Sequence, residues 1–198
     1  MNREEYRAFY ERQALSYGND HLTRDYIRVQ FILNNLRPGD IVLEIGCQSG
    51  GITRFIAELA DFVVAVDVAE NYIKKARKIV DRVNVLFKVG FGEDINPKEV
   101  SPSGGFDVVV LMEILEHVEE PRRLLYVTKK VLFNGGKVLI TVPDENYVDP
   151  LGEHKTVFTR ESFEDLIKKH FQDYIIFKSG YEEEPFDWYF CVATKGNK

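Results

Sequence analysis

A glycine-rich segment carries the residue types of a cofactor-binding turn. Residues 42–53 read Val-Leu-Glu-Ile-Gly-Cys-Gln-Ser-Gly-Gly-Ile-Thr, so an apolar run with Glu44 leads into a turn that contains Gly46, Gly50 and Gly51. In an open α/β sheet, ligands bind in the crevice beside the first strand-to-helix turn, and glycines there let the backbone approach the ligand closely. The segment therefore predicts a site for a nucleotide-like cofactor.

Two carboxylates flank this turn. Asp67 ends the next apolar run, residues 62–67, where its two oxygens could accept hydrogen bonds from the two hydroxyls of a ribose. Glu44 could face a cationic amino-acid group. A dinucleotide site would require the pattern Gly-x-Gly-x-x-Gly, but Gln48 occupies the central position, and this weakens a prediction of hydride transfer.

Three residues with chemically active side chains follow the apolar run 106–112. Glu113, Glu116 and His117 are spaced i, i+3 and i+4, so a helical turn would place them on one face. His117 is the candidate general base for a hydroxyl acceptor, because a neutral imidazole can take its proton; the alternative is a helix-start residue bonded to backbone. With His154 from a later loop, the same residues could instead bind magnesium or manganese, which would polarise a hydroxyl directly.

An acidic segment at 92–95 adds a possible contact to a nucleobase. Asp94 could accept a hydrogen bond from an exocyclic amine while Ile95 packs on the ring, and we favour this role over the alternative of an exposed acidic loop. Near the start of the chain, aromatic residues suit a lid over an apolar substrate, and core packing explains them equally well. These residues are Tyr6, Phe9, Tyr10 and Tyr17.

The elements that must position these side chains alternate along the chain. Short β-rich runs alternate with helical patterns, which indicates a parallel sheet with helices on its faces. Strands are expected at 41–45, 62–67, 83–88, 106–112, 136–142, 173–178 and 187–194, the last two forming an antiparallel edge. Helices are expected at 2–17, 22–36, 51–59, 70–80, 121–132 and 160–170.

Composition limits the class of protein. A length of 198 residues suits a single domain, and a net charge of -6 disfavours broad binding to phosphate backbones. Cys47 and Cys191 form no paired motif, so we expect a reduced, cytoplasmic protein. The charged N-terminal segment and the lack of a long apolar run argue against export and against a membrane span.

Taken in order, these motifs resemble those of the class I S-adenosylmethionine (SAM)-dependent methyltransferases, and in particular the type 11/23-like members similar to the ubiquinone-pathway O-methyltransferases. The resemblance rests on residues 44–50, Asp67, 92–95, 106–110, 113–118 and 134–140, and covers nearly the whole chain. Gln48 departs from the glycine usual in the family. The resemblance implies a three-layer Rossmann-like α/β fold with a seven-stranded, mostly parallel sheet of order 3-2-1-4-5-7-6.

The resemblance also implies SAM as the cofactor. We expect it to be held by residues in or beside these motifs: Glu44, Gly46, Cys47, Gln48, Gly50, Asp67, Val68, Asp94, Ile95 and Met112. Residues 1–37 would form a helical lid on a catalytic core at 38–198, within one methyltransferase domain. Substrate selection is expected in the loops near 143–159, where this family gathers its acceptor-binding residues.

Three functions compete on these observations. The first is methyl transfer to a small-molecule acceptor at oxygen, with His117 as the catalytic residue. The second is a metal-dependent RNA 2′-O-methyltransferase, because Glu113, Glu116, His117 and His154 resemble the pattern of those enzymes; the acidic net charge disfavours it. The third, motivated by Gln48, is a non-catalytic partner subunit. The sequence leaves the acceptor and the oligomeric state open.

Overall fold

The computed structural model describes residues 2–16, 26–182 and 184–196. The chain divides into two compact units, Met1–Gly105 and Phe106–Lys198, and each is described by itself. Position 17 and positions 22–25, which belong to the two expected N-terminal helices, lie outside the described residues. Within the described part of the chain, every helix is too short or too polar to cross a bilayer.

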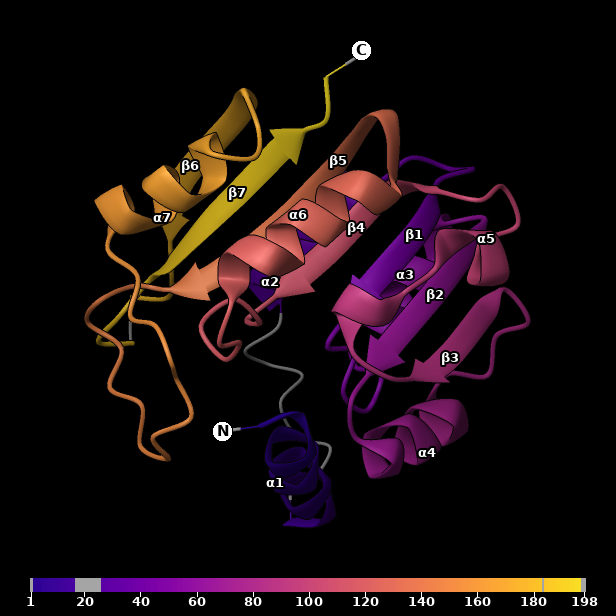
Figure 1. Ribbon diagram of the computed structural model, residues 1–198, viewed down its shortest axis with the longest axis horizontal. Helices are drawn as coiled ribbons and strands as arrows, with labels where there is room; N and C mark the ends of the chain where they lie inside the picture. Colours follow the sequence, from indigo (N-terminus) through magenta and orange to yellow (C-terminus); the bar gives the residue numbers. More distant parts are fainter. Residues whose placement is uncertain (1, 17–25, 183, 197–198) are drawn as a thin grey trace. The chain divides into compact units, whose positions relative to one another are not determined.

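The first unit is built on parallel strands that run side by side (Figure 1). Its strands are β1 (Ile41–Ile45), β2 (Phe62–Asp67) and β3 (Val85–Val89). β1 pairs with β2 from Ile41↔Phe62 to Ile45↔Val66, and it is buried along its whole length, as a strand covered on both faces must be. Parallel pairing brings the carboxyl ends of β1 and β2 together, which places the glycine-rich turn beside Asp67.

The helices of the first unit include two short ones that the sequence analysis did not predict. They are η2 (Gly92–Asp94), a 3-10 turn, and α5 (Pro97–Val100); the others are α1 (Arg3–Ser16), α2 (Tyr26–Leu33), α3 (Thr53–Leu59) and α4 (Glu70–Ile79). A start signal for α5 was present, because Asn96 caps the helix by accepting from the Lys98 N–H and Pro97 occupies the first turn.

The second unit has a parallel pair and an antiparallel edge. Its strands are β4 (Phe106–Met112), β5 (Leu132–Pro143), β6 (Asp173–Ser179) and β7 (Trp188–Thr194), and its helices are α6 (Pro121–Val131) and α7 (Arg160–Lys168). β4 pairs with β5 in parallel, whereas β7 pairs antiparallel with both β5 and β6 (Figure 1). Thr159 and Ser162 form the capping box that begins α7.

The strand order confirms the predicted fold class. The seven strands follow the order β3-β2-β1-β4-β5-β7-β6, and β7 is antiparallel to both of its neighbours, β5 and β6. This is the mostly parallel Rossmann-like sheet that the motif order implies, with crossover helices between its parallel strands.

The largest boundary difference among the described residues is at the start of β5. β5 begins at Leu132, whereas the sequence predicted a helix to residue 132 and a strand only from 136. Gly135 adopts a φ of 78°, its N–H donates to the Lys195 carbonyl, and the register against β4 shifts between Phe106 and Val108. The glycine pair therefore forms an irregularity inside a longer strand, and it does not end the strand as a turn would.

Candidate functional site

The glycine-rich turn is held against the end of β2. The N–H groups of Gly46 and Cys47 both donate to the Val66 carbonyl, at 2.8 and 3.1 Å. Gly46 and Gly50 have φ values of 81° and 82°, which side chains disfavour. A Cβ on Gly50 would also lie 2.8 Å from Val80 Cγ2, so the turn and α4 can approach each other only because this residue is glycine.

Gln48 has a backbone conformation that ordinarily favours glycine. Its φ is 45°, in the left-handed region, and its side chain is exposed. Its N–H still donates to Asp67 Oδ2 at 2.9 Å. A non-glycine residue at position 48 therefore costs backbone strain but leaves the path of the turn intact.

Replacing Gln48 by glycine is expected to raise the free energy of unfolding by up to about 1 kcal/mol, because glycine relieves the left-handed strain and no buried contact is lost. Urea unfolding measures this change. Ser49→Gly is the matched control, since Ser49 lies in the same turn without a positive φ and should gain nothing. If Gln48→Gly lost as much unfolding free energy as Ser49→Gly, the strain argument would be contradicted.

Asp67 joins the turn to the start of α4. One carboxylate oxygen accepts from the Gln48 N–H and the other from the Ala69 N–H, each at 2.9 Å. Burial raises the pKa of Asp67 to about 6, and these two N–H donors oppose the rise. A carboxylate offers about four acceptor positions. The Val68 N–H also favours the ionised carboxylate, and the acceptor capacity that remains could serve a ribose hydroxyl.

Glu44 and Cys47 occupy buried positions beside the turn. The Thr53 hydroxyl, in the first turn of α3, donates to Glu44 Oε2 at 2.6 Å and fixes the orientation of that carboxylate. Burial, reinforced by the charges of Asp67 and Glu44, holds the pKa of the Cys47 thiol well above its usual value. Cys47 is thus an unreactive thiol that packs against the turn.

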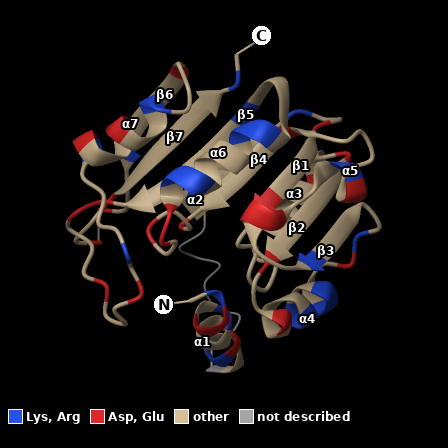
Figure 2. Cartoon of the chain, viewed as in Figure 1, with Lys and Arg blue, Asp and Glu red and all other residues tan. Residues whose placement is uncertain are grey.

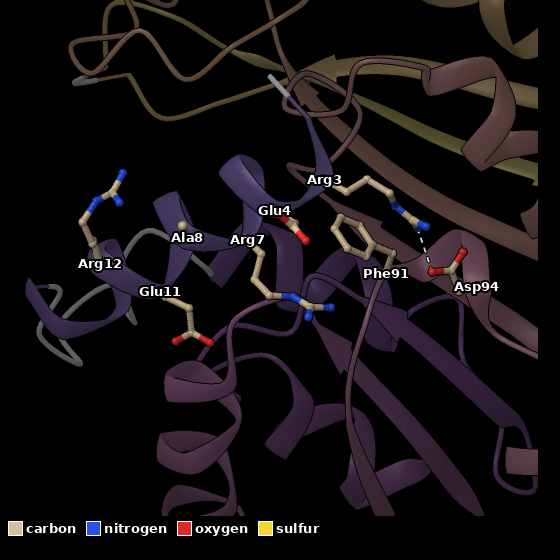
Figure 3. Close-up of a pocket in the computed structure, with 8 residues that line it drawn as sticks. All are labelled: Arg3, Glu4, Arg7, Ala8, Glu11, Arg12, Phe91 and Asp94. Carbon is tan, nitrogen blue, oxygen red and sulfur yellow. Dashed lines mark ion pairs between the residues drawn. The ribbon is translucent and has the colours of Figure 1, made fainter.

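Asp94 and Ile95 are placed differently from each other. Ile95 is buried, whereas Asp94 is half-exposed and forms an ion pair with Arg3 of α1 at 2.8 Å. The Arg3 guanidinium also lies 3.9 Å from the centre of the Phe91 ring (Figure 3). Tyr6 packs on the same ring. Sequence reasoning missed Arg3 and Phe91 as partners of this segment. The aromatic N-terminal residues were the signal that α1 packs here.

A pocket of about 680 Å³ lies between α1 and the segment that leads into η2. Figure 3 shows its lining residues: Arg3, Glu4, Arg7, Ala8, Glu11, Arg12, Phe91 and Asp94. Farther along α1, the Glu11 carboxylate accepts from the Glu70 and Asn71 N–H groups and so caps α4, which begins two residues after Val68. Helix α1 is therefore attached to the loops that carry the expected cofactor residues.

Within the second unit, Glu113 lies at the end of β4 with a strained backbone. Its φ is 53°, and its carboxylate accepts from the Thr141 hydroxyl at 2.8 Å and from the Trp188 indole N–H at 2.7 Å. The Thr141 hydroxyl also lies 3.6 Å from the sulfur of Met112. The carboxylate is thereby directed to β5 and β7, and Glu113 does not join the group of possible metal ligands.

The structure does bring three other predicted residues together. One ligand atom each from Glu116, His117 and His154 lies within 4.8 Å of the other two. Glu116 is buried, and its Oε1 is 3.9 Å from His117 Nε2. Burial, reinforced by His154, lowers the pKa of His117 to about 4, and burial also lowers the pKa of His154. Both imidazoles are therefore neutral at pH 7.

Aromatic rings continue from this group toward β7. Tyr147 stacks on His154 with centroids 5.0 Å apart and meets Phe186 edge-on, and Phe186 in turn meets Trp188. The loop of residues 144–158, drawn in Figure 1 between β5 and α7, supplies both Tyr147 and His154. The loop expected to select the acceptor thus lies against the histidine pair.

Comparison with known proteins identifies the relatives of this chain. A family model described as a methyltransferase domain matches residues 20–176. A curated relative, the ubiquinone biosynthesis O-methyltransferase of Xanthomonas axonopodis pv. citri, is 30% identical over 155 residues, which are 75% of this chain and 62% of the relative. The chain thus spans less than two thirds of the length of that relative.

Solved structures share the fold at low identity. A phosphoethanolamine N-methyltransferase 2 from Haemonchus contortus, solved with SAM, has a TM-score of 0.74 at 18% identity and covers 97% of this chain and 60% of that one. The [4+2]-cyclase SpnF has a TM-score of 0.71 at 15% identity and covers 87% and 82%. Since the fold hosts a cyclase as well as methyltransferases, the reaction must be argued from the site.

Proposed function

Because the chain belongs to the SAM-dependent methyltransferase family, we propose that it transfers a methyl group from SAM to a hydroxyl of a small molecule. The family uses SAM as its methyl donor. The observation that carries the proposal is the Asp67 carboxylate at the end of β2, which closes the glycine-rich turn and retains acceptor capacity for a ribose hydroxyl.

The residues present suit this cofactor. We assign the ribose hydroxyls to Asp67, the close backbone approach to Gly46, Gln48 and Gly50, and the cationic amino-acid part to Glu44. The other expected contacts are Cys47, Val68, Asp94, Ile95 and Met112. When bound, SAM supplies an electrophilic methyl group on a sulfonium. The protein contributes alignment of the acceptor with that methyl group and exclusion of water.

Helix α1 would act with this site as a lid. In the structure Arg3 holds the Asp94 carboxylate that we assign to the adenine amine. Binding of adenine there would exchange the Arg3 ion pair for a hydrogen bond. An exposed ion pair of this kind contributes at most about 1 kcal/mol, so exchanging it for a hydrogen bond changes the free energy little in either direction. The division into a lid at 1–37 and a core at 38–198 is proposed on this basis.

Transfer to oxygen is supported by the relatives and by His117. The curated relatives are named O-methyltransferases, and His117 presents a neutral imidazole within the cluster beside the acceptor loop. We propose His117 as a residue that acts on the acceptor hydroxyl. Cytoplasmic localisation belongs to the same proposal.

An RNA acceptor is the less favoured alternative. The loop at 144–158 contains four acidic residues and one lysine, and Figure 2 shows acidic positions along it. Phosphate backbones bind where Lys and Arg gather, so this loop would repel a polynucleotide. The charge of the acceptor loop thus supports a small molecule.

The proposal is tested first by calorimetric titration with S-adenosylhomocysteine and then by transfer from methyl-labelled SAM. The acceptor panel contains a catechol, a simple phenol, a primary amine, a carboxylic acid and a thiol. We expect label on the hydroxyl compounds, and a loss of rate of about 10²–10⁴-fold in His117→Gln. Label on the amine alone would refute the oxygen assignment. Binding with no transfer to any class would favour a non-catalytic subunit.

A further inference from the structure

We propose that Glu116, His117 and His154 form a binding site for a divalent transition-metal ion such as zinc or cobalt. All three residues belong to the second unit, and one ligand atom from each lies within 4.8 Å of the others. One carboxylate oxygen and two imidazole nitrogens make a donor set that proteins use for zinc. Metal binding would require these distances to shorten to the roughly 3.3 Å that separates ligands around a metal with bonds near 2 Å.

The backbone holds the two halves of this cluster together. The Glu116 carbonyl accepts from the N–H groups of both Lys155 and Thr156, at 2.6 and 3.1 Å. The turn that carries Glu116 and His117 is thus joined to the loop directly after His154, although the two histidines are far apart in sequence. Such attachment fixes the ligands before any ion binds and lowers the entropic cost of binding.

The His154 side is braced separately. Its N–H donates to Asp149 Oδ2 at 2.7 Å, its ring stacks on Tyr147, and it meets the His117 ring edge-on at 4.7 Å. The hydrogen bond fixes the backbone of residue 154, and the two ring contacts restrict the orientation of its imidazole. The cluster therefore has the fixed backbone and the oriented ring expected of a built site.

The chemistry of the cluster selects the class of ion. Two imidazoles and one carboxylate supply the donor atoms, and a divalent ion would bring positive charge to the buried Glu116 carboxylate. Magnesium prefers oxygen ligands, whereas imidazole suits zinc, cobalt and nickel. We therefore propose zinc, cobalt or nickel in place of the magnesium or manganese that the sequence suggested. The structure also reduces the ligand set, since Glu113 is held by Thr141 and Trp188.

Three protein ligands would leave one position for an exchangeable oxygen ligand. A metal there would polarise a bound hydroxyl, so His117 would act on the acceptor as a ligand and not as a base. The inference concerns metal binding itself and does not depend on the identity of the acceptor.

The test uses untagged full-length protein that has been dialysed against a chelator. Cobalt(II) is titrated while visible absorption is recorded, and zinc is titrated by calorimetry. We expect one ion per chain, with affinity reduced on the order of 100-fold or more in Glu116→Gln and in His154→Gln. Glu113→Gln, in the same turn, and His170→Gln, outside the cluster, are the matched controls and should retain binding.

Two outcomes would overturn the inference. One is the absence of saturable binding in wild-type protein whose circular dichroism is that of a folded chain. The other is binding that survives in both cluster variants or that is lost equally in the His170 control. S-adenosylhomocysteine is titrated into the same samples. Retained cofactor binding without metal binding would refute the metal site alone and leave the proposed methyl transfer standing.

Discussion

Lowering the pH from about 8 to about 5 is expected to weaken binding of S-adenosylhomocysteine, with the loss beginning near the pKa of Asp67. Burial raises that pKa to about 6 in the free protein. A ribose diol donates hydrogen bonds and therefore prefers the ionised carboxylate, so its binding competes with a proton below pH 6. Affinity should be flat above about pH 7 and fall by up to about tenfold per unit below 6.

Asp67→Asn is the matched variant, because it keeps the size of the side chain but cannot titrate. It should bind about 10–100-fold more weakly at pH 8, since one acceptor oxygen is lost, and the fall of affinity near pH 6 should disappear. Calorimetry across this pH range measures both effects. A variant that keeps wild-type affinity and the wild-type pH profile would show that Asp67 does not contact the cofactor.

The raised pKa of Asp67 also makes the stability of the free protein depend on pH. Its folded pKa of about 6 lies above the ordinary value of 3.8, so the folded state binds more protons between these values. The stabilisation is therefore present below about pH 4 and is lost as the pH rises through 6. The pKa shift of about two units corresponds to a pH-dependent loss of unfolding free energy on the order of 3 kcal/mol. The Asp67→Asn variant should not show this loss as the pH rises.

The sequence was sufficient for those parts of the fold and site that depend on local patterns. The strands that end at Ile45, Asp67 and Met112 follow from apolar runs, and the placement of the glycine turn beside Asp67 follows from parallel pairing of neighbouring strands. The predicted start of β5 was wrong because Gly135 and Gly136 indicate a turn. In the structure both glycines form backbone hydrogen bonds with Lys195, which lies far from them in sequence, and they remain in the strand.

Contacts between distant segments were beyond sequence reasoning. The spacing of Glu113 and Glu116 predicted a shared face, but the two carboxylates have different partners because Thr141 and Trp188, on other strands, hold the first. The pairing of His117 with His154 was predicted from residue type and from the resemblance to metal-dependent RNA 2′-O-methyltransferases. What brings them together is backbone hydrogen bonding to Glu116, which no side-chain pattern reveals.

Replacing Glu113 by alanine is expected to lower the free energy of unfolding by about 2–4 kcal/mol, the largest effect on stability that we predict for a single side chain. Its carboxylate accepts from the Thr141 hydroxyl and the Trp188 indole N–H, and both donors are buried. Truncation removes two hydrogen bonds and leaves two buried polar groups without the acceptor they face. The positive φ of 53° persists in alanine, so no strain is relieved in compensation.

A double-mutant cycle in urea separates this polar pair from simple loss of packing. Trp188→Phe keeps most of the ring but removes the N–H donor, and Glu113→Gln keeps an acceptor oxygen without the charge. If the carboxylate holds the indole, Glu113→Ala should cost less in the Trp188→Phe background by roughly 1–2 kcal/mol, because that hydrogen bond is already absent. Glu113→Gln should lower the free energy of unfolding by about half as much as Glu113→Ala. If the losses of unfolding free energy in Glu113→Ala and Trp188→Phe simply add in the double mutant, the hydrogen bond between these two residues contributes nothing to stability. Other contacts must then hold Glu113 in its strained conformation at the end of β4.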